Sequence, residues 1–296
     1  FLIEQASFEK VVLADIKPPQ QHQACRFVED LLLSGKISYV ESDVRKPINL
    51  SVVPGMECEV ACIANFAAVH REPGHLAHEY FETNILGARN VTAFAEAVCC
   101  EDMIFTSSIS PYGPSESPKS EEAVPTPETP YGSSKLAAEL IHEAWLRTGG
   151  SSRRLLTVRP GVVFGPGEGG NVSRLVNALT KGFFVYAGNR ATRKAGIYVK
   201  ELCRAMWWLH EHMALGNVSM VTANMSMNPG PSMEEYVETI QQVAGRKAIV
   251  PAIPVWSLMF AARLIQTFLA PLGVFKSVNV VRVRKIIRSN NIVPGV

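Results

Sequence analysis

The sequence predicts an α/β protein with a Rossmann-like, doubly wound parallel sheet and a smaller, mostly helical C-terminal lobe. Three observations predict this class. Hydrophobic residues make up 47% and charged residues 19% of the 296 residues, a balance typical of a packed globular protein. Short apolar runs alternate with helical segments up to residue 165, as in parallel sheets covered by helices. After Pro166 that rhythm is lost. We therefore expect domains over 1–165 and 166–296, the second interleaved with the last sheet strands.

The elements of the first domain follow from their residue patterns. VVLAD (Val11–Asp15) is a short β-branched run that ends on an acid, the pattern of a buried parallel strand. Gly87 is the one weak point in a helix predicted over Ala77–Val98. Strands are expected at Val11–Asp15, Ile37–Glu41, Val60–Ala68, Met103–Ser108 and Arg154–Gly165, the last running into a loop, and helices at Ala24–Leu33, Ala77–Val98 and Tyr131–Arg147.

The second lobe is predicted to hold helices at Val172–Lys181, Lys200–Met213 and Met233–Ala244. Its tail contains a strongly apolar segment, Ile253–Phe275, which is interrupted by Arg263, Gln266, Thr267 and Pro271. A membrane-spanning helix needs about twenty predominantly apolar residues. We therefore expect a helix packed on the lobe, with contact to a membrane surface as the less favoured alternative.

Charge and cysteine usage exclude several classes of function. The net charge is +2, from 29 basic and 27 acidic residues, so no nucleic-acid partner is predicted. The basic run Val281–Arg288 alternates with apolar residues and indicates an amphipathic surface segment. The six cysteines form no C-x-x-C pair and have no histidine at zinc spacing. They indicate reduced, buried thiols of a cytoplasmic protein without a metal site, and the N-terminus shows no signal-peptide pattern.

The stretch PYGSSKLAAEL places Tyr131 four residues before Lys135 at the head of a predicted helix. Residues at this spacing share one helical face. A nearby ammonium lowers the pKa of a phenol, but acting as a base near neutrality requires a shift of about three units, or about 4 kcal/mol. One partly solvated lysine does not supply that alone, so the pair predicts a second cation at the site. Ser108, at the carboxyl end of a predicted strand, is placed to bind the same substrate oxygen.

Four motifs in order carry a family resemblance: NILGARNV, FTSSISPYG, PYGSSKLAAE and VRPGVVFGPG. Together they resemble the extended short-chain dehydrogenase/reductase superfamily, and within it the NAD-dependent epimerase/dehydratase group that acts on nucleotide sugars. The resemblance runs from about Val11 to Leu202. It implies that Tyr131 is the catalytic acid/base, that Lys135 lowers its pKa and holds the nicotinamide ribose, and that Ser108 is the third catalytic residue.

The resemblance also implies an NAD site in the domain over 1–165. Asp15 would bind the adenosine ribose hydroxyls, since a carboxylate accepts hydrogen bonds from a diol and repels the 2′-phosphate of NADP. The cofactor-binding residues implied are Asp15, Asp43, Val44, Ala67, Ala68, Asn84, Tyr131, Lys135 and Pro160.

The sequence departs from the family pattern in three places. The opening strand and its G-x-x-G-x-x-G turn, which lets backbone amides approach the pyrophosphate, are missing, and we expect preceding residues to supply them. Ile109 and Ser110 stand where dehydratases carry acids, so dehydration is not expected. Val162 replaces an asparagine that contacts the sugar diphosphate.

Substrate contacts are therefore assigned elsewhere, to Ser108, Asn171 and Lys194. Arg193 is a further candidate for the diphosphate, and His70 is expected to be a polar loop residue without a ligand role.

The function implied is that of an NAD-dependent nucleotide-sugar oxidoreductase of polysaccharide biosynthesis, a 4-epimerase or 4-ketoreductase, acting as a homodimer through two long helices. Two alternatives remain. The sequence also resembles the 3β-hydroxysteroid dehydrogenase branch, for which the apolar segment would serve a lipid substrate, and a non-catalytic NAD-binding protein would keep the same fold.

Overall fold

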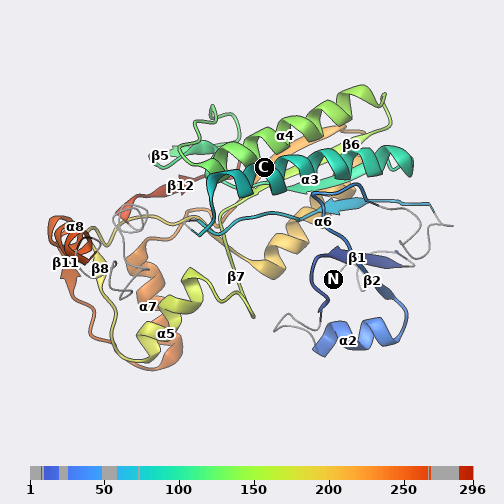
Figure 1. The fold of residues 1–296 in the computed structure, drawn as a ribbon. Helices are drawn as coiled ribbons and strands as arrows, with labels where there is room; N and C mark the ends of the chain where they lie inside the picture. The colour runs from blue at the N-terminus through green and yellow to red at the C-terminus, as the bar shows by residue number, and fades with distance from the viewer. Residues whose placement is uncertain are drawn as a thin grey trace.

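Four parallel strands form the main sheet of the computed structural model, in the order β10–β6–β4–β3 (Figure 1). The structure describes residues 8, 10–19, 26–48, 59–72, 74–265, 267 and 287–295. The strands are β3 (Ile63–Asn65), β4 (Asp102–Thr106), β6 (Arg154–Pro160) and β10 (Met220–Met225). The α/β class with a Rossmann-like parallel sheet is confirmed.

A second parallel pair lies beside this sheet, made of β1 (Val11–Asp15) and β2 (Ile37–Glu41) with α2 (Arg26–Leu33) between them. In the doubly wound order 3-2-1-4-5-6, β2 and β1 occupy the places of strands 3 and 2, and β3 that of strand 4. Within the described part, the loop that follows β2 contacts the helix over Ala77–Ala97: Asn90 Nδ2 donates to the Val44 carbonyl at 2.7 Å.

Helices cover both faces of the main sheet. On one face, α3 (Ala77–Ala97) and α4 (Pro130–Thr148) pack on each other and on Met103 and Phe105 of β4. On the other, α6 (Val199–Leu215) packs on Ile104. Successive strand residues point to opposite faces, so one continuous apolar strand supplies two cores.

The fifth predicted strand is divided in the structure. β6 ends at Pro160, and β7 (Val162–Phe164) leaves the main sheet to pair with β9 (Gly196–Tyr198). Gly161 marks the break, because a Cβ atom there would lie 2.6 Å from the Ala195 carbonyl oxygen. The single strand expected over Arg154–Gly165 was therefore wrong in extent.

The second lobe contains more strand than predicted. Its helices α5 (Asn171–Thr180) and α7 (Met233–Ala244) pack on each other, and β8 (Tyr186–Ala187) pairs with β11 (Ala252–Ile253). The tail strand β12 (Asn290–Ile292) pairs with β5 (Ser115–Lys119), which lies in the polar loop of the first domain and follows the short 3₁₀ helix η3 (Ser110–Tyr112). β10 comes from beyond residue 165 but lies in the main sheet; the boundary at 165 stays a prediction.

The predicted apolar segment begins with α8 (Val255–Leu264), and its residues beyond 267 lie outside the described part, as do 281–286 of the basic run. Among the described helices, none has the length and hydrophobicity needed to cross a bilayer. The described cysteines Cys62, Cys99, Cys100 and Cys203 are free, and Cys99 is exposed, contrary to the prediction of buried thiols; Cys25 and Cys58 lie outside the described residues.

Candidate active site

The start of α4 positions Tyr131 and Lys135 at the carboxyl ends of the main strands. The Thr129 hydroxyl accepts the Gly132 amide at 3.1 Å and caps the helix, and Pro130 occupies its first turn. Ser108 follows β4, and its side chain lies close enough to the phenol of Tyr131 to counteract the rise of the Tyr131 pKa. The three predicted catalytic residues are thereby brought to one place.

Tyr131 is half-buried, and its environment favours the neutral phenol. Burial is the main cause that raises its pKa, and the nearby Glu72 and Tyr80 add to the rise. The side chain of Ser108 opposes this rise of the pKa. The lowering of the Tyr131 pKa by Lys135 stays a prediction.

Lys135 is almost completely buried, contrary to the partly solvated side chain that was expected. Its residue is 1% exposed, and Nζ lies 4.3 Å from the centroid of the Phe105 ring. Burial lowers the pKa of Lys135 to about 7, and the carboxylate of Glu139, one helical turn away, acts in the opposite direction. The charge of this ammonium at neutral pH therefore depends on its neighbours.

Ser108 is held by the turn that follows it. Its Oγ accepts the Ser110 amide at 3.1 Å and donates to Ser110 Oγ at 3.2 Å. Ile109 and Ser110 thus supply no carboxyl group beside Ser108.

Asn84 joins α3 to the site. Its Nδ2 donates to Ser134 Oγ at 2.8 Å, and its Oδ1 accepts the Val69 amide at 3.0 Å. Because Ser134 precedes Lys135 on α4, this buried amide fixes both the helix and the loop after β3.

The residues predicted to hold the adenosine end of NAD lie after β1 and β2. Asp15 ends β1 with an exposed carboxylate, whose Oδ1 accepts the Lys17 amide at 2.9 Å. Asp43 pairs with Arg45 through contacts of 2.6–3.0 Å, and these hydrogen bonds lower its pKa. An exposed carboxylate at the end of β1 fits a ribose diol.

Ala67 and Ala68 follow β3, and Pro160 ends β6, with β4 between these two strands. The Ala67 amide donates to Asn65 Oδ1 at 3.2 Å, and Pro160 is buried, with its carbonyl accepting the Ile109 amide at 3.2 Å. Half-buried alanines leave room for a flat group beside the backbone. These residues fit NAD.

A buried polar network beneath the site was missed from the sequence. Arg159 of β6 binds Glu139 of α4 and donates through Nη1 to the Tyr112 hydroxyl at 2.7 Å; that hydroxyl donates to Asn224 Oδ1 at 2.9 Å. The Ser107 hydroxyl also donates to Glu139. A signal for Glu139 was present, because it continues the four-residue spacing of Tyr131 and Lys135 along one helical face.

The predicted substrate residues beyond Ser108 lie in the second lobe. Asn171 is exposed at the first position of α5. Lys194 donates through Nζ to the Arg288 carbonyl, and Arg193 donates to the Gly230 carbonyl. His70 is an exposed residue of the loop that follows β3. Their roles toward a substrate stay predictions.

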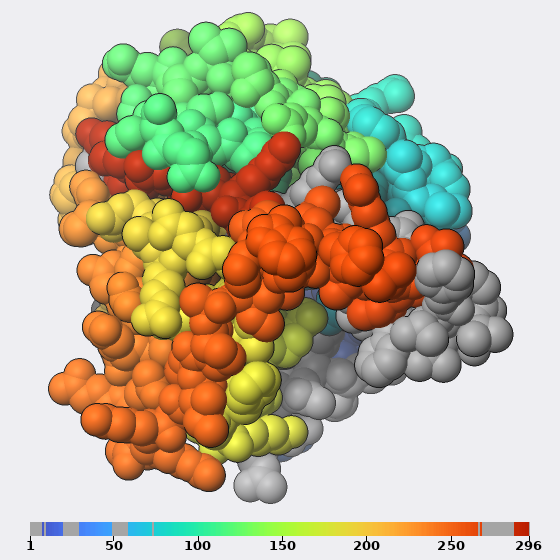
Figure 2. Space-filling model, turned by 90° about the vertical axis from the view of Figure 1, so that its left-hand side faces the viewer, coloured from blue at the N-terminus to red at the C-terminus, as the bar shows by residue number. Residues whose placement is uncertain are grey.

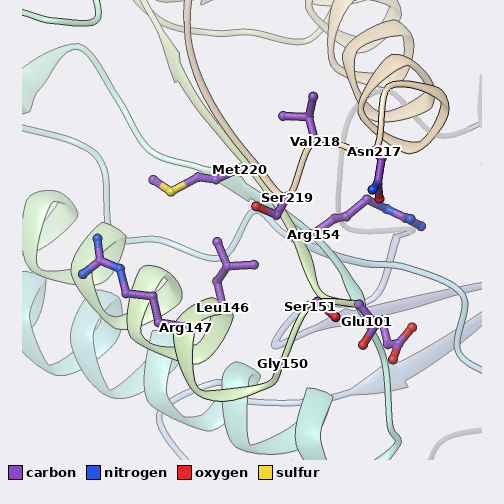
Figure 3. A pocket seen from close by; sticks show the side chains of 11 residues that line it. Glu101, Leu146, Arg147, Gly150, Ser151, Arg154, Asn217, Val218, Ser219 and Met220 are labelled. Atoms are coloured by element: carbon purple, nitrogen blue, oxygen red, sulfur yellow. The ribbon is translucent and has the colours of Figure 1, made fainter.

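A hollow of about 700 Å³ lies at the opposite end of the sheet (Figure 3). Leu146 and Arg147 of α4 line it with Arg154 and Met220, the first residues of β6 and β10. In open α/β sheets, ligands bind outside the carboxyl ends of the strands. This hollow is therefore separate from the candidate active site.

Comparison with known families shows to which family the chain belongs. Residues 3–221 match the model of the NAD dependent epimerase/dehydratase family. The chain belongs to this family. The family's name states that its members depend on NAD, which is the cofactor predicted from the sequence. The same match confirms the prediction of an enzyme of this family.

The curated relatives are mainly epimerases. The chain is 29% identical over 181 residues to N-acetyl-alpha-D-glucosaminyl-diphospho-ditrans,octacis-undecaprenol 4-epimerase of Escherichia coli O157:H7, which covers 61% of the chain and 54% of the relative. It is 25% identical over 189 residues to UDP-glucose 4-epimerase 2 of Oryza sativa subsp. japonica, covering 57% of the chain and 46% of the relative. The chain thus spans about half the length of these relatives.

Solved structures show the same fold at lower identity. UDP-glucuronic acid 4-epimerase from Bacillus cereus in complex with NAD aligns with a TM-score of 0.70 and 18% identity, over 86% of this chain and 80% of that one. MoeE5 in complex with UDP-glucose and NAD aligns with a TM-score of 0.64 and 21% identity, over 82% and 85%.

Proposed function

We propose that this chain is a sugar 4-epimerase that acts on a sugar carried by a diphosphate. The observation that carries the proposal is the placement of Tyr131 at the start of α4, with Ser108 beside its phenol and the buried Lys135 one helical turn later. The relatives whose names specify 4-epimerases support the reaction type. A 4-ketoreductase would use the same residues for half of the cycle.

NAD, when bound, supplies the hydride acceptor and donor for the sugar carbon. The chain's own part is proton transfer. The Tyr131 oxygen takes the proton of the C4 hydroxyl and later returns it. The Ser108 hydroxyl holds the C4 oxygen of the substrate in position by a hydrogen bond. The ammonium form of Lys135 stabilises the Tyr131 phenolate. The carboxylate of Glu139 favours this charged form of the lysine, because it raises the Lys135 pKa.

A diphosphate-linked sugar is the substrate class shared by the relatives. Their names specify both a nucleoside and a polyprenol as the group that carries the diphosphate. Asn171 and Lys194 are proposed to contact this diphosphate, since an amide and an ammonium both donate hydrogen bonds to phosphate oxygens.

The proposal is tested by replacing Tyr131 with Phe and measuring interconversion of UDP-N-acetylglucosamine and UDP-N-acetylgalactosamine in the presence of NAD. Loss of the acid/base should reduce kcat by about 10²–10⁴-fold, while NAD binding measured by calorimetry is retained. Tyr186→Phe, in β8 of the second lobe, is the control and should turn over like the wild type. Turnover by Tyr131→Phe within a few-fold of the wild type would contradict the proposal.

A further inference from the structure

One face of α8 is apolar and exposed. Trp256 is 74%, Phe260 61% and Leu264 43% exposed. Their four-residue spacing places them in one stripe along the helix. On the opposite side Ala262 is 1% exposed and Leu258 is half-buried, so the helix is attached to the lobe by one face only. The sequence predicted that this helix packs on the lobe, and the structure shows this packing for one of its two faces.

The position of α8 gives this stripe access from solution. The helix follows β11, at the end of the second lobe farthest from α3 and α4 (Figure 1). Seen from that end, the orange-red α8 segment crosses the middle of the molecular face (Figure 2). Three large apolar side chains that share one exposed helical stripe are typical of a binding surface.

Charge identifies the partner. α8 contains no acidic residue, and its one charged side chain, the exposed Arg263, falls within the apolar stripe, seven residues after Trp256. After Glu238 the sequence contains no Asp or Glu, whereas it contains Arg and Lys at eight positions. A chain of net charge +2 therefore concentrates its excess positive charge in its last residues, the segment that includes α8.

We propose that α8 docks this chain on an anionic phospholipid surface, with Trp256, Phe260 and Leu264 inserted at the boundary between headgroups and acyl chains. Trp and Phe favour this boundary, and an arginine beside them extends its guanidinium toward lipid phosphates while its stem stays among the apolar groups. Basic residues near the surface add attraction to anionic lipids. The helix lies on the membrane and does not span it, in agreement with its ten residues.

The test is flotation of the purified chain with vesicles of phosphatidylcholine alone or with 30% phosphatidylglycerol (about one lipid in three, enough to give a surface potential). The wild type should float with the anionic vesicles and bind pure phosphatidylcholine at least tenfold more weakly. Trp256→Ser/Phe260→Ser should lower binding to anionic vesicles at least tenfold. Trp208→Ser, which removes a 55% exposed tryptophan from α6, is the matched control and should bind like the wild type.

Tryptophan fluorescence gives a second readout. Insertion should shift the emission of the wild type to shorter wavelength on adding anionic vesicles, and Trp256→Phe should remove the shift although Trp145, Trp207 and Trp208 remain. Melting temperature and NAD binding report that the variants are folded.

Two outcomes would overturn the docking proposal: a wild type that does not float, or a double variant that floats equally well. Self-association of the wild type that is lost in the double variant, without vesicle binding, would assign the stripe to a second copy of the chain. Turnover of a soluble UDP-sugar is measured in a separate assay. An absence of epimerase activity would therefore not affect the vesicle result, and an absence of vesicle binding would not affect the activity result.

Discussion

Glu139 binds Arg159 by two hydrogen bonds, from Nε to Oε1 at 2.9 Å and from Nη2 to Oε2 at 2.6 Å, and both residues are buried. The pair connects α4 to β6, and Glu139 lies one helical turn after Lys135. Removing one partner of such a buried pair leaves an uncompensated charge and costs about 3–5 kcal/mol. The Glu139 carboxylate therefore interacts with two basic residues: it hydrogen-bonds Arg159, and its charge raises the pKa of Lys135, the residue proposed to act in catalysis.

Glu139→Gln tests the effect on Lys135. The amide oxygen can still accept from Arg159, but the negative charge that raises the Lys135 pKa is lost. That pKa should fall below its value of about 7, so the ammonium is lost at lower pH, and the alkaline limb of the kcat/KM profile should move to lower pH. Glu143→Gln, which breaks the exposed 3.0 Å pair with Arg147 on the same helix, should leave the limb in place. An equal shift in both variants would contradict the prediction.

His142 should make stability depend on pH. Its Nδ1 donates to the Ala138 carbonyl and its Nε2 accepts from Asn65 Nδ2 at 3.2 Å, so the ring is held neutral, and burial lowers its pKa to about 4. Between the ordinary pKa of 6.5 and about 4 the unfolded chain binds a proton that the folded chain does not. The free energy of unfolding should therefore fall by about 3 kcal/mol as the pH falls through this window.

Urea unfolding at pH 7 and pH 4.5 measures this loss. His142→Gln should be less stable at pH 7 and should show a smaller decrease on acidification. The exposed His212 is the control position, and His212→Gln should keep the wild-type decrease. A decrease in His142→Gln as large as in the wild type would show that other groups cause the acid sensitivity.

Gly161→Ala should destabilise the junction of β6 and β7. The added methyl would lie 2.6 Å from a backbone oxygen of Ala195, which moves only if the strand moves. Overpacking of this kind costs about 1–3 kcal/mol, measurable as a lower urea midpoint. Gly74→Ala meets only a 3.5 Å contact with the Arg71 oxygen and should be neutral within about 0.5 kcal/mol. Equal midpoints for the two variants would refute the steric argument.

The proposed homodimer predicts the effect of a charge on α4. Leu140 is 58% exposed, and Phe81 and Leu86 of α3 are 37% and 39% exposed, which leaves an apolar surface on the two long helices. Leu140→Glu should convert the dimer to a monomer in light scattering, because an unpaired carboxylate would be buried at the interface. Val124→Glu, at a 76% exposed loop position, should not. A monomeric wild type would exclude this interface.

The sequence predicted the elements that local pattern defines. α4 begins and ends within one residue of the helix expected over Tyr131–Arg147, because its cap and apolar spacing are encoded nearby. β5 was missed because SESPK is polar, and it becomes a strand only by pairing with β12, 175 positions along the chain in the Ser115–Asn290 register. The end of β6 at Gly161 likewise depends on a contact with Ala195 that no local pattern contains.

The site was predictable in its residue types and not in its electrostatics. Ser108, Tyr131 and Lys135 could be placed together from spacing and strand ends. Their pKa values depend on how deeply the fold buries each side chain, and the spacing carries no such information. The same limit applies to Arg159, a charged side chain within a mainly apolar strand, whose partner on α4 is known only from the structure.

The pairing of β12 with β5 also sets an order of events during synthesis. Asn224 Nδ2 of β10 donates to the Val293 carbonyl at 3.3 Å, and the Gly295 amide donates to Glu121 Oε2 at 2.9 Å. Translation runs from the N-terminus, and these partners emerge from the ribosome last among the described residues. Residues 115–119 therefore complete β5 only after residues 287–295 have been made.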